Sequence, residues 1–373
     1  MADSKIFGTG SIGPKKSLLN PELVRPDWQT INPRPTDLLW LDKNENLDPQ
    51  LFEFNKKIWS EMDPIALSTY PECASLYKKL ANWLNLAPEN LILTPGSDGA
   101  IRMVFEAFVN EGDLVVHTSP TFAMYPVYSQ IFGARVNPLV YENSIDGPRL
   151  TANQIISHLK HNKPKLFCLP NPDSPTGNVI LPNDLRKIIE LCASQDTVVL
   201  IDEAYHPFYD WTCVQWISEF QNLVVARTFA KAWGLAGLRI GYAVGHSELI
   251  KYLHKLRPMY EVSTVSIAMM EKMLDYSEEM RLSVNRINDG KNYFANEMTK
   301  LGLKVLYTHG NFLHVNFGKY AHTVHQSLRG KVLYRLDFKD LCLSGYSRFS
   351  CTTVDAFRPI VEIIRATINK QAS

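Results

Sequence analysis

From about residue 50, the chain alternates short apolar runs with longer stretches whose apolar residues recur at helical spacing. This alternation is typical of an α/β fold built on a mostly parallel sheet. The apolar runs that predict strands are residues 91–93, 114–117, 166–169, 198–201 and 223–226, and the predicted helices include 72–86, 98–110, 151–160 and 182–194.

The pattern changes after about residue 247, which predicts a second, smaller α+β domain. Helical stretches at 247–256 and 266–300 are followed by the apolar runs "LKVLY" and "FLHVNF", the helix-like segment 321–328 and a C-terminal helix from Val354 to Ile368. Five prolines between Pro14 and Pro35 exclude a continuous helix there and predict an extended arm that docks on another part of the chain. We therefore expect an arm and part of the small domain over 1–45, a large domain over 46–250 and a small domain over 251–373.

Composition narrows the possible functions. Hydrophobic residues make up 45% of the 373 residues and charged residues 21%, with a net charge of +1 and no basic run, so neither nucleic acid nor a membrane is an expected partner. The six cysteines are scattered without metal-ligand spacing, and no apolar run of membrane-spanning length occurs. We expect a cytoplasmic protein with reduced thiols and no metal.

Polar residues follow each predicted strand of the large domain. The strands are followed in turn by "TPGSDG", "TSPTF", "PNPDSPTG", "DEAY" and "RTFAK". The carboxyl ends of parallel strands meet at one edge of a sheet, so these segments converge there. They supply an anion-binding helix start, an aromatic ring, a carboxylate and Lys231, which together could hold pyridoxal phosphate.

The order "YPE…TPGSDG…PTF…NPDSPTG…DEAY…TFAKAWGLAGLRIGY" resembles the fold-type I pyridoxal-phosphate enzymes, and within them the histidinol-phosphate aminotransferase branch. The resemblance extends from "LDKNEN" at residue 41 to "GYSRFSCTT" at 345–353. It implies a mostly parallel seven-stranded sheet in the large domain, pyridoxal 5'-phosphate as cofactor, and a homodimer with a shared active site.

The resemblance assigns the central chemistry to Lys231, which binds the cofactor covalently and moves the substrate Cα proton. A lysine with this role needs a lowered pKa, whereas a surface lysine would only lay its stem along apolar neighbours. Asp202 corresponds to the acid that pairs with the pyridinium nitrogen, and Tyr205 to the phenol that bonds the cofactor's 3' oxygen. Phe122 takes the place of the aromatic residue that stacks on the ring.

The cofactor phosphate has several implied donors. They are the backbone N–H groups of Ser97 and Asp98 at a helix start, the Thr228 hydroxyl and the Arg239 guanidinium. Tyr70 resembles the tyrosine that reaches the phosphate bound by the neighbouring subunit, so the active site would lie at a dimer interface.

Two arginines correspond to substrate-binding positions. Arg348 matches the residue that binds an α-carboxylate, and Arg335 the one that binds a distal phosphate. We expect an aminotransferase that moves an amino group between an amino acid such as glutamate and a small, phosphorylated keto or amino compound. A decarboxylase of a phosphorylated amino acid is the alternative, and a non-catalytic relative is disfavoured because Lys231 and Asp202 are both present.

Two positions depart from the family pattern. Ser174 stands where the family has an asparagine that bonds the cofactor's 3' oxygen, so that contact is lost, mediated by water, or made by Asn171 or Asp173. Ala230 replaces a serine that binds the phosphate, which removes a charge-assisted hydrogen bond of about 1–3 kcal/mol.

Overall fold

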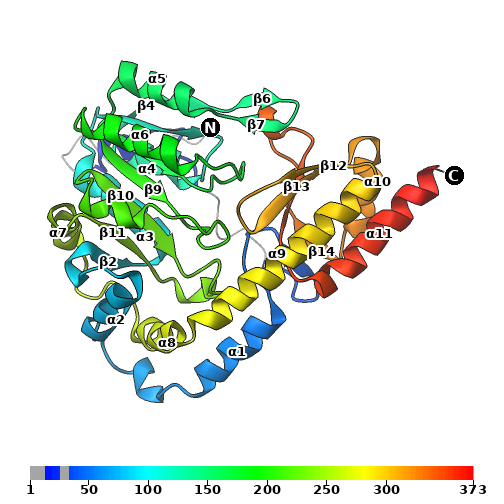
Figure 1. Cartoon of the computed structure of the whole chain (residues 1–373), viewed down its shortest axis with the longest axis horizontal. Coiled ribbons are helices and arrows are strands. Elements are labelled where there is room, and N and C mark those ends of the chain that lie inside the picture. Colours follow the sequence, from blue (N-terminus) through cyan, green and yellow to red (C-terminus); the bar gives the residue numbers. More distant parts are fainter. Residues whose placement is uncertain (1–12, 26–32, 373) are drawn as a thin grey trace.

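The computed structural model describes residues 13–25 and 33–372. Its main sheet has the strand order β2-β11-β10-β9-β8-β3-β4, and β5 also pairs with β3 (Figure 1). All neighbouring pairs are parallel except those of β11, which runs antiparallel to both β2 and β10. The strands are β2 (Leu91–Thr94), β3 (Leu114–Ser119), β4 (Arg135–Val136), β5 (Leu139–Val140), β8 (Leu166–Pro170), β9 (Val198–Asp202), β10 (Leu223–Thr228) and β11 (Gly241–Gly245).

Both faces of this sheet are buried, because successive side chains of a strand point to opposite faces. On β9, Val199 and Ile201 pack in one hydrophobic cluster with residues of α5 (Ala152–Asn162) and α6 (Pro182–Ala193). Val198 and Leu200 pack in another cluster with α3 (Gly96–Phe108), α4 (Met124–Ile131) and α7 (Ser247–Leu256). The continuous apolar runs of the sequence reflect this burial on two sides.

Local sequence fixes several helix starts. Asp48 caps α1 (Pro49–Ser60) by accepting from the Gln50 N–H, and proline occupies the first helical position. Thr151 and Gln154 form a capping box at the start of α5. The remaining helices of the first 275 residues are α2 (Ala74–Leu84) and α8 (Thr264–Asp275).

The C-terminal part of the chain packs around a second sheet, which is antiparallel and has the strand order β12-β13-β15. The long helix α9 runs from α8 toward this sheet, and helix α11 packs against α9 (Figure 1). The elements are α9 (Ser277–Lys300), β12 (Lys304–Tyr307), β13 (Phe312–Asn316), α10 (Ala321–Leu328), β14 (Val332–Tyr334), β15 (Ser347–Ser350) and α11 (Val354–Ala372), with β1 (Leu39–Leu41) pairing with β14 and a hairpin of β6 (Glu142–Ser144) and β7 (Gly147–Arg149).

The structure differs from the sequence prediction in several places, and three of them bear on the arrangement of the site. The predicted helix 266–300 is divided at Tyr276, whose backbone leaves the helical region. The glycine-flanked strand β11 was not predicted. The described arm residues 13–25 lie against α4, where Ser17 Oγ donates to the Ile131 carbonyl at 2.7 Å, whereas β1 joins the C-terminal part through β14.

Among the described residues, no helix combines the length and apolar composition needed to cross a membrane. The domain boundaries at residues 45 and 250 stay a prediction.

Candidate active site

A cavity of about 280 Å³ opens at the carboxyl ends of β8, β9 and β10. Ten of the twelve predicted site residues line it, and Tyr70 and Arg335 do not. Lys43 and Asn44, which the sequence analysis did not assign, also line the cavity. The ten are Ser97, Asp98, Phe122, Ser174, Asp202, Tyr205, Thr228, Lys231, Arg239 and Arg348.

One end of the cavity is suited to an anion. Helix α3 begins at Gly96, whose φ of +73° favours glycine, and a Cβ there would lie 2.9 Å from Arg239 Nη2. The missing side chain therefore lets the guanidinium lie against the positive end of the helix. With Ser97 and the Thr228 hydroxyl beside it, this end offers the donors that a phosphate requires.

The other end holds a buried acid. Asp202 is the last residue of β9 and only 5% exposed, and burial raises its pKa to about 7. Its carboxylate accepts from the Tyr125 hydroxyl at 3.2 Å and from the Ala204 N–H at 3.0 Å, but forms no ion pair with a described residue. A positively charged N–H group of a ligand would complete this environment.

Lys231 lies between these two ends. Its Nζ donates to the Lys43 carbonyl at 2.8 Å. Burial, followed by the charge of Arg348, lowers the pKa of Lys231 to about 8, although Glu45 acts in the opposite direction. At this pKa roughly a tenth of the lysine is an uncharged amine at pH 7, far more than of a free lysine, and the uncharged form is the one that acts as a nucleophile or base.

Asn44 is the partner of Tyr205 that the sequence analysis missed. Its Nδ2 donates to the Tyr205 hydroxyl at 2.9 Å, and its left-handed backbone (φ +56°) is fixed by a hydrogen bond from its N–H to Ser350 Oγ at 2.7 Å. Burial raises the pKa of Tyr205, and hydrogen bonds from Ser174 and Asn44 counteract it.

Neither Asn171 nor Asp173 turns its side chain toward the cavity. Asn171 Nδ2 donates to the Ile180 carbonyl at 3.2 Å, and Asn171 Oδ1 accepts from the Ile180 N–H at 2.8 Å. Asp173 is buried and accepts from Thr118 at 2.9 Å and from Thr176 Oγ1 at 2.6 Å. Of the three alternatives for the family asparagine, these contacts disfavour replacement by Asn171 or Asp173, because both side chains bond to neighbouring protein groups.

The two candidate substrate arginines are neighbours through the backbone. Arg348 lies on β15, and its N–H donates to the Arg335 carbonyl at 2.8 Å. Arg348 is 9% exposed, its Nη2 donates to the Asp42 carbonyl at 2.8 Å, and its buried Nε has no partner among the described residues. The exposed Arg335 side chain lies over the Phe338 ring at 4.0 Å, outside the cavity wall.

Tyr70 is 75% exposed and stacks on Tyr260 with ring centroids 4.4 Å apart. It does not line the cavity of its own chain, and its predicted contact with a neighbouring subunit stays a prediction.

Residues 36–364 match the family model for aminotransferase class I and II. The chain belongs to this family. The aminotransferase is 32% identical over 333 residues to the histidinol-phosphate aminotransferase of Caldanaerobacter subterraneus subsp. tengcongensis, which covers 88% of this chain and 93% of that relative. It is 34% identical over 320 residues to the histidinol-phosphate aminotransferase of Thermoanaerobacter sp. strain X514, covering 85% and 89%.

The aminotransferase also shares its fold with solved structures. The histidinol-phosphate aminotransferase of Sinorhizobium meliloti in complex with pyridoxal-5'-phosphate aligns with a TM-score of 0.77 at 20% identity, over 92% of this chain and 96% of that one. The corresponding enzyme from Clostridium acetobutylicum also gives 0.77, at 19% identity. These comparisons confirm the predicted fold class, family and pyridoxal-phosphate-dependent aminotransferase activity.

The cavity of the aminotransferase fits its cofactor, pyridoxal 5'-phosphate. A phosphate matches the donors at the start of α3, and a protonated ring nitrogen matches Asp202, the buried acid without an ion-pair partner. Between them stands Lys231, the amine that would bind the aldehyde.

Proposed function

We propose specific roles for the cavity residues. Lys231 Nζ binds the cofactor and, once free, carries the proton from the substrate Cα. The cofactor supplies an electron sink for the bond that breaks at Cα. Asp202 holds positive charge at the end of β9, Tyr205 donates to the ring oxygen, and Phe122 packs on the ring face. The decisive support is the lowered pKa of Lys231, at about 8, between an anion cradle and a buried acid.

The arginines indicate the substrate class. Arg348, whose buried Nε has no partner among the described residues, suits a carboxylate. Arg335, which pairs directly with Arg348 through two backbone hydrogen bonds, suits a second anion at the rim. We infer that the enzyme exchanges an amino group between glutamate and a phosphorylated compound of the histidinol-phosphate type. Both substrates would use the same pair of arginines.

A spectroscopic titration tests this function. Glutamate is expected to convert the visible band of the lysine-bound cofactor into the near-ultraviolet band of the aminated cofactor, and a phosphorylated keto acceptor is expected to restore it. Release of carbon dioxide from a phosphorylated amino acid, with no response to glutamate, would instead indicate a decarboxylase.

Substitution of Arg335 tests the second anion. Arg335→Ala is expected to raise KM for histidinol phosphate far more than for histidinol, because only the former presents a phosphate. Arg329→Ala, which removes another exposed arginine of the same region, serves as the control. Equal effects on both substrates would remove Arg335 from the site.

We propose a cytoplasmic homodimer in which Tyr70 completes the partner's phosphate site. Exposed apolar side chains accompany Tyr70, among them Leu67 at 75% and Met259 at 82% exposure, and such residues favour an interface. All six cysteines are free, which suits a reducing compartment. Mixing inactive Lys231→Ala and Tyr70→Ala chains should restore activity, since one site of each mixed dimer is then intact; no recovery would refute the shared site.

A further inference from the structure

A second and larger cavity, of about 600 Å³, lies behind the catalytic one. The two cavities meet at one segment, because Tyr205 lines the catalytic cavity and the next residue, His206, lines the second. The opposite walls are the end of α2 at Trp83 and the first half of α9, from Glu278 to Asn288.

The floor of this cavity is apolar and its rim is polar. Phe208, Val214, Met280 and Val284 are buried in the floor. Six polar side chains line the rim: Asp210, Gln215, Glu278, Arg281, Asn285 and Asn288. They make no ion pair or side-chain hydrogen bond with any described residue, so their hydrogen-bonding capacity is available to a ligand.

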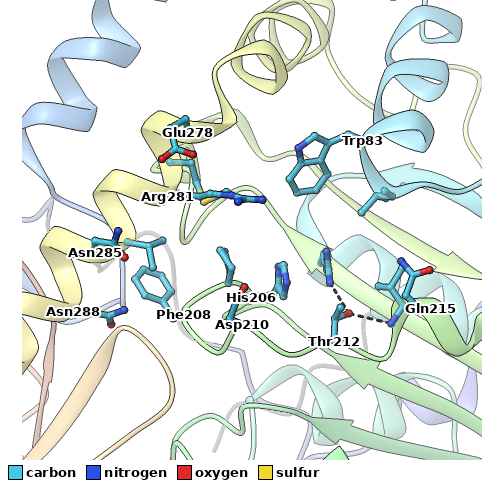
Figure 2. A pocket seen from close by; sticks show the side chains of 16 residues that line it. Trp83, His206, Phe208, Asp210, Thr212, Gln215, Glu278, Arg281, Asn285 and Asn288 are labelled. Atoms are coloured by element: carbon cyan, nitrogen blue, oxygen red, sulfur yellow. Dashed lines mark hydrogen bonds between the residues drawn. The ribbon is translucent and has the colours of Figure 1, made fainter.

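The two arginines that line this cavity differ in whether they are ion-paired. Arg227 is buried and ion-paired with Glu203 at 2.8 Å, so its guanidinium is already engaged within the protein. Arg281 has no such partner, and Figure 2 shows it extending from α9 across the cavity toward Trp83 and His206. Burial, together with these two arginines, lowers the pKa of His206 to about 3, so its ring is neutral and offers both a donor and an acceptor.

This combination matches one class of small molecule. An unpaired guanidinium suits a carboxylate, the two acids Asp210 and Glu278 suit an ammonium group, and a floor beside Trp83, Phe208 and His206 suits a flat apolar body. We propose that this cavity is a second binding site, for a free α-amino acid with an aromatic side chain. Its carboxylate would contact Arg281 and its ammonium Glu278.

The site goes beyond the proposed transamination, because it contains no cofactor-binding residue. A ligand there would contact His206, the neighbour of Tyr205 in the chain, without touching a residue that lines the catalytic cavity.

Calorimetric titration of the holoenzyme with α-methyl-L-phenylalanine tests the site. This probe keeps both charged groups but has no Cα proton, so it cannot be transaminated. We expect calorimetry to show two binding events per chain. Absorbance recorded over the same titration should show that one event changes the visible band of the cofactor and the other does not. Arg281→Ala should weaken only the second event, by about tenfold, because it removes a charge-assisted contact.

Matched variants separate the two charged contacts. Glu278→Gln should weaken the second event for α-methyl-L-phenylalanine but not for 3-phenylpropionate, which lacks the ammonium. Arg358→Ala, on α11, is the control for loss of an exposed arginine. A single binding event, or a second event that neither Arg281→Ala nor Glu278→Gln alters, would overturn the proposal, and retention of the cofactor band shows that each variant is folded.

Discussion

Arg348 is expected to control the protonation of Lys231 as well as substrate binding. After burial, its positive charge is the largest cause that lowers the pKa of Lys231 from 10.5 to about 8. Arg348→Gln removes this charge and keeps a side chain of similar size. Arg335→Gln is a matched control, because Arg335 pairs with Arg348 through the backbone but lies outside the cavity.

The size of the effect follows from the shared cavity. At an effective dielectric constant of about 20, two like charges across such a cavity repel by about 2 kcal/mol, and partial exposure of the lysine reduces this to about 1 kcal/mol. Removing the arginine should therefore raise the pKa of Lys231 by roughly 0.7 units. Burial remains, so the pKa should stay below that of a free lysine.

The direction of the pKa shift of Lys231 determines the pH range in which cofactor capture changes. Lys231 is charged below its pKa and reactive above it, so capture of the cofactor by the apoprotein should speed up with a midpoint near pH 8. In Arg348→Gln the midpoint should move to higher pH, and capture near pH 7.5 should slow roughly fourfold. Stopped-flow absorbance at the visible band measures both. The reasoning is refuted if the midpoint does not move, or if Arg335→Gln moves it as far.

Three further changes test other parts of the structure. Gly96→Ala should weaken cofactor binding, because its Cβ would meet Arg239 Nη2 at 2.9 Å and displace the guanidinium, whereas Gly237→Ala, with open space, should not; equal affinities measured by fluorescence titration would contradict this. Ser174→Asn should shift the pH midpoint of the cofactor's visible band downward, because it supplies an amide donor to the cofactor's 3' oxygen beside Tyr205. An unchanged titration would show that another group, such as Asn44 beside Tyr205, already satisfies the 3' oxygen. Gly290→Ala should destabilise the fold by more than about 2 kcal/mol in urea unfolding, since its Cβ would lie 1.8 Å from the Thr352 carbonyl oxygen; wild-type stability would mean that α9 can move away.

The sequence predicted the strand ends well because their chemistry is local. A buried parallel strand is a continuous apolar run, and the residue that follows it necessarily lies at the carboxyl edge of the sheet. Asp202 and Thr228 each end a strand, and Lys231 follows three residues later. Their convergence in one cavity needs no information beyond the strand order.

Features that depend on distant contacts could not be predicted in this way. Tyr125 reaches Asp202 across 77 positions of the sequence, and nothing in its helix distinguishes it from a core tyrosine. The antiparallel pairing of residues 335 and 348 brings the two arginines together, but only Arg348 lines the cavity. A sequence gives their spacing of thirteen residues but not which side chain faces inward.

The segment Asp42–Asn44 shows how such distant contacts organise the whole site. Its three residues bond three different cavity groups: the Asp42 carbonyl accepts from Arg348, the Lys43 carbonyl from Lys231, and Asn44 donates to Tyr205. Arg34 holds the segment from outside through paired hydrogen bonds to Glu45 at 2.7 and 2.8 Å.

These contacts place the segment in competition with the ligands. In the proposed roles, a substrate carboxylate at Arg348 would compete with the Asp42 carbonyl for Nη2, and the cofactor would compete with the Lys43 carbonyl for Lys231 Nζ. A charged acceptor binds a guanidinium more strongly than a carbonyl does, so the exchange favours the substrate while the carbonyls keep both cations oriented beforehand. The segment Asp42–Asn44 therefore preorganises the cavity, because it holds the cationic side chains in place before a ligand binds.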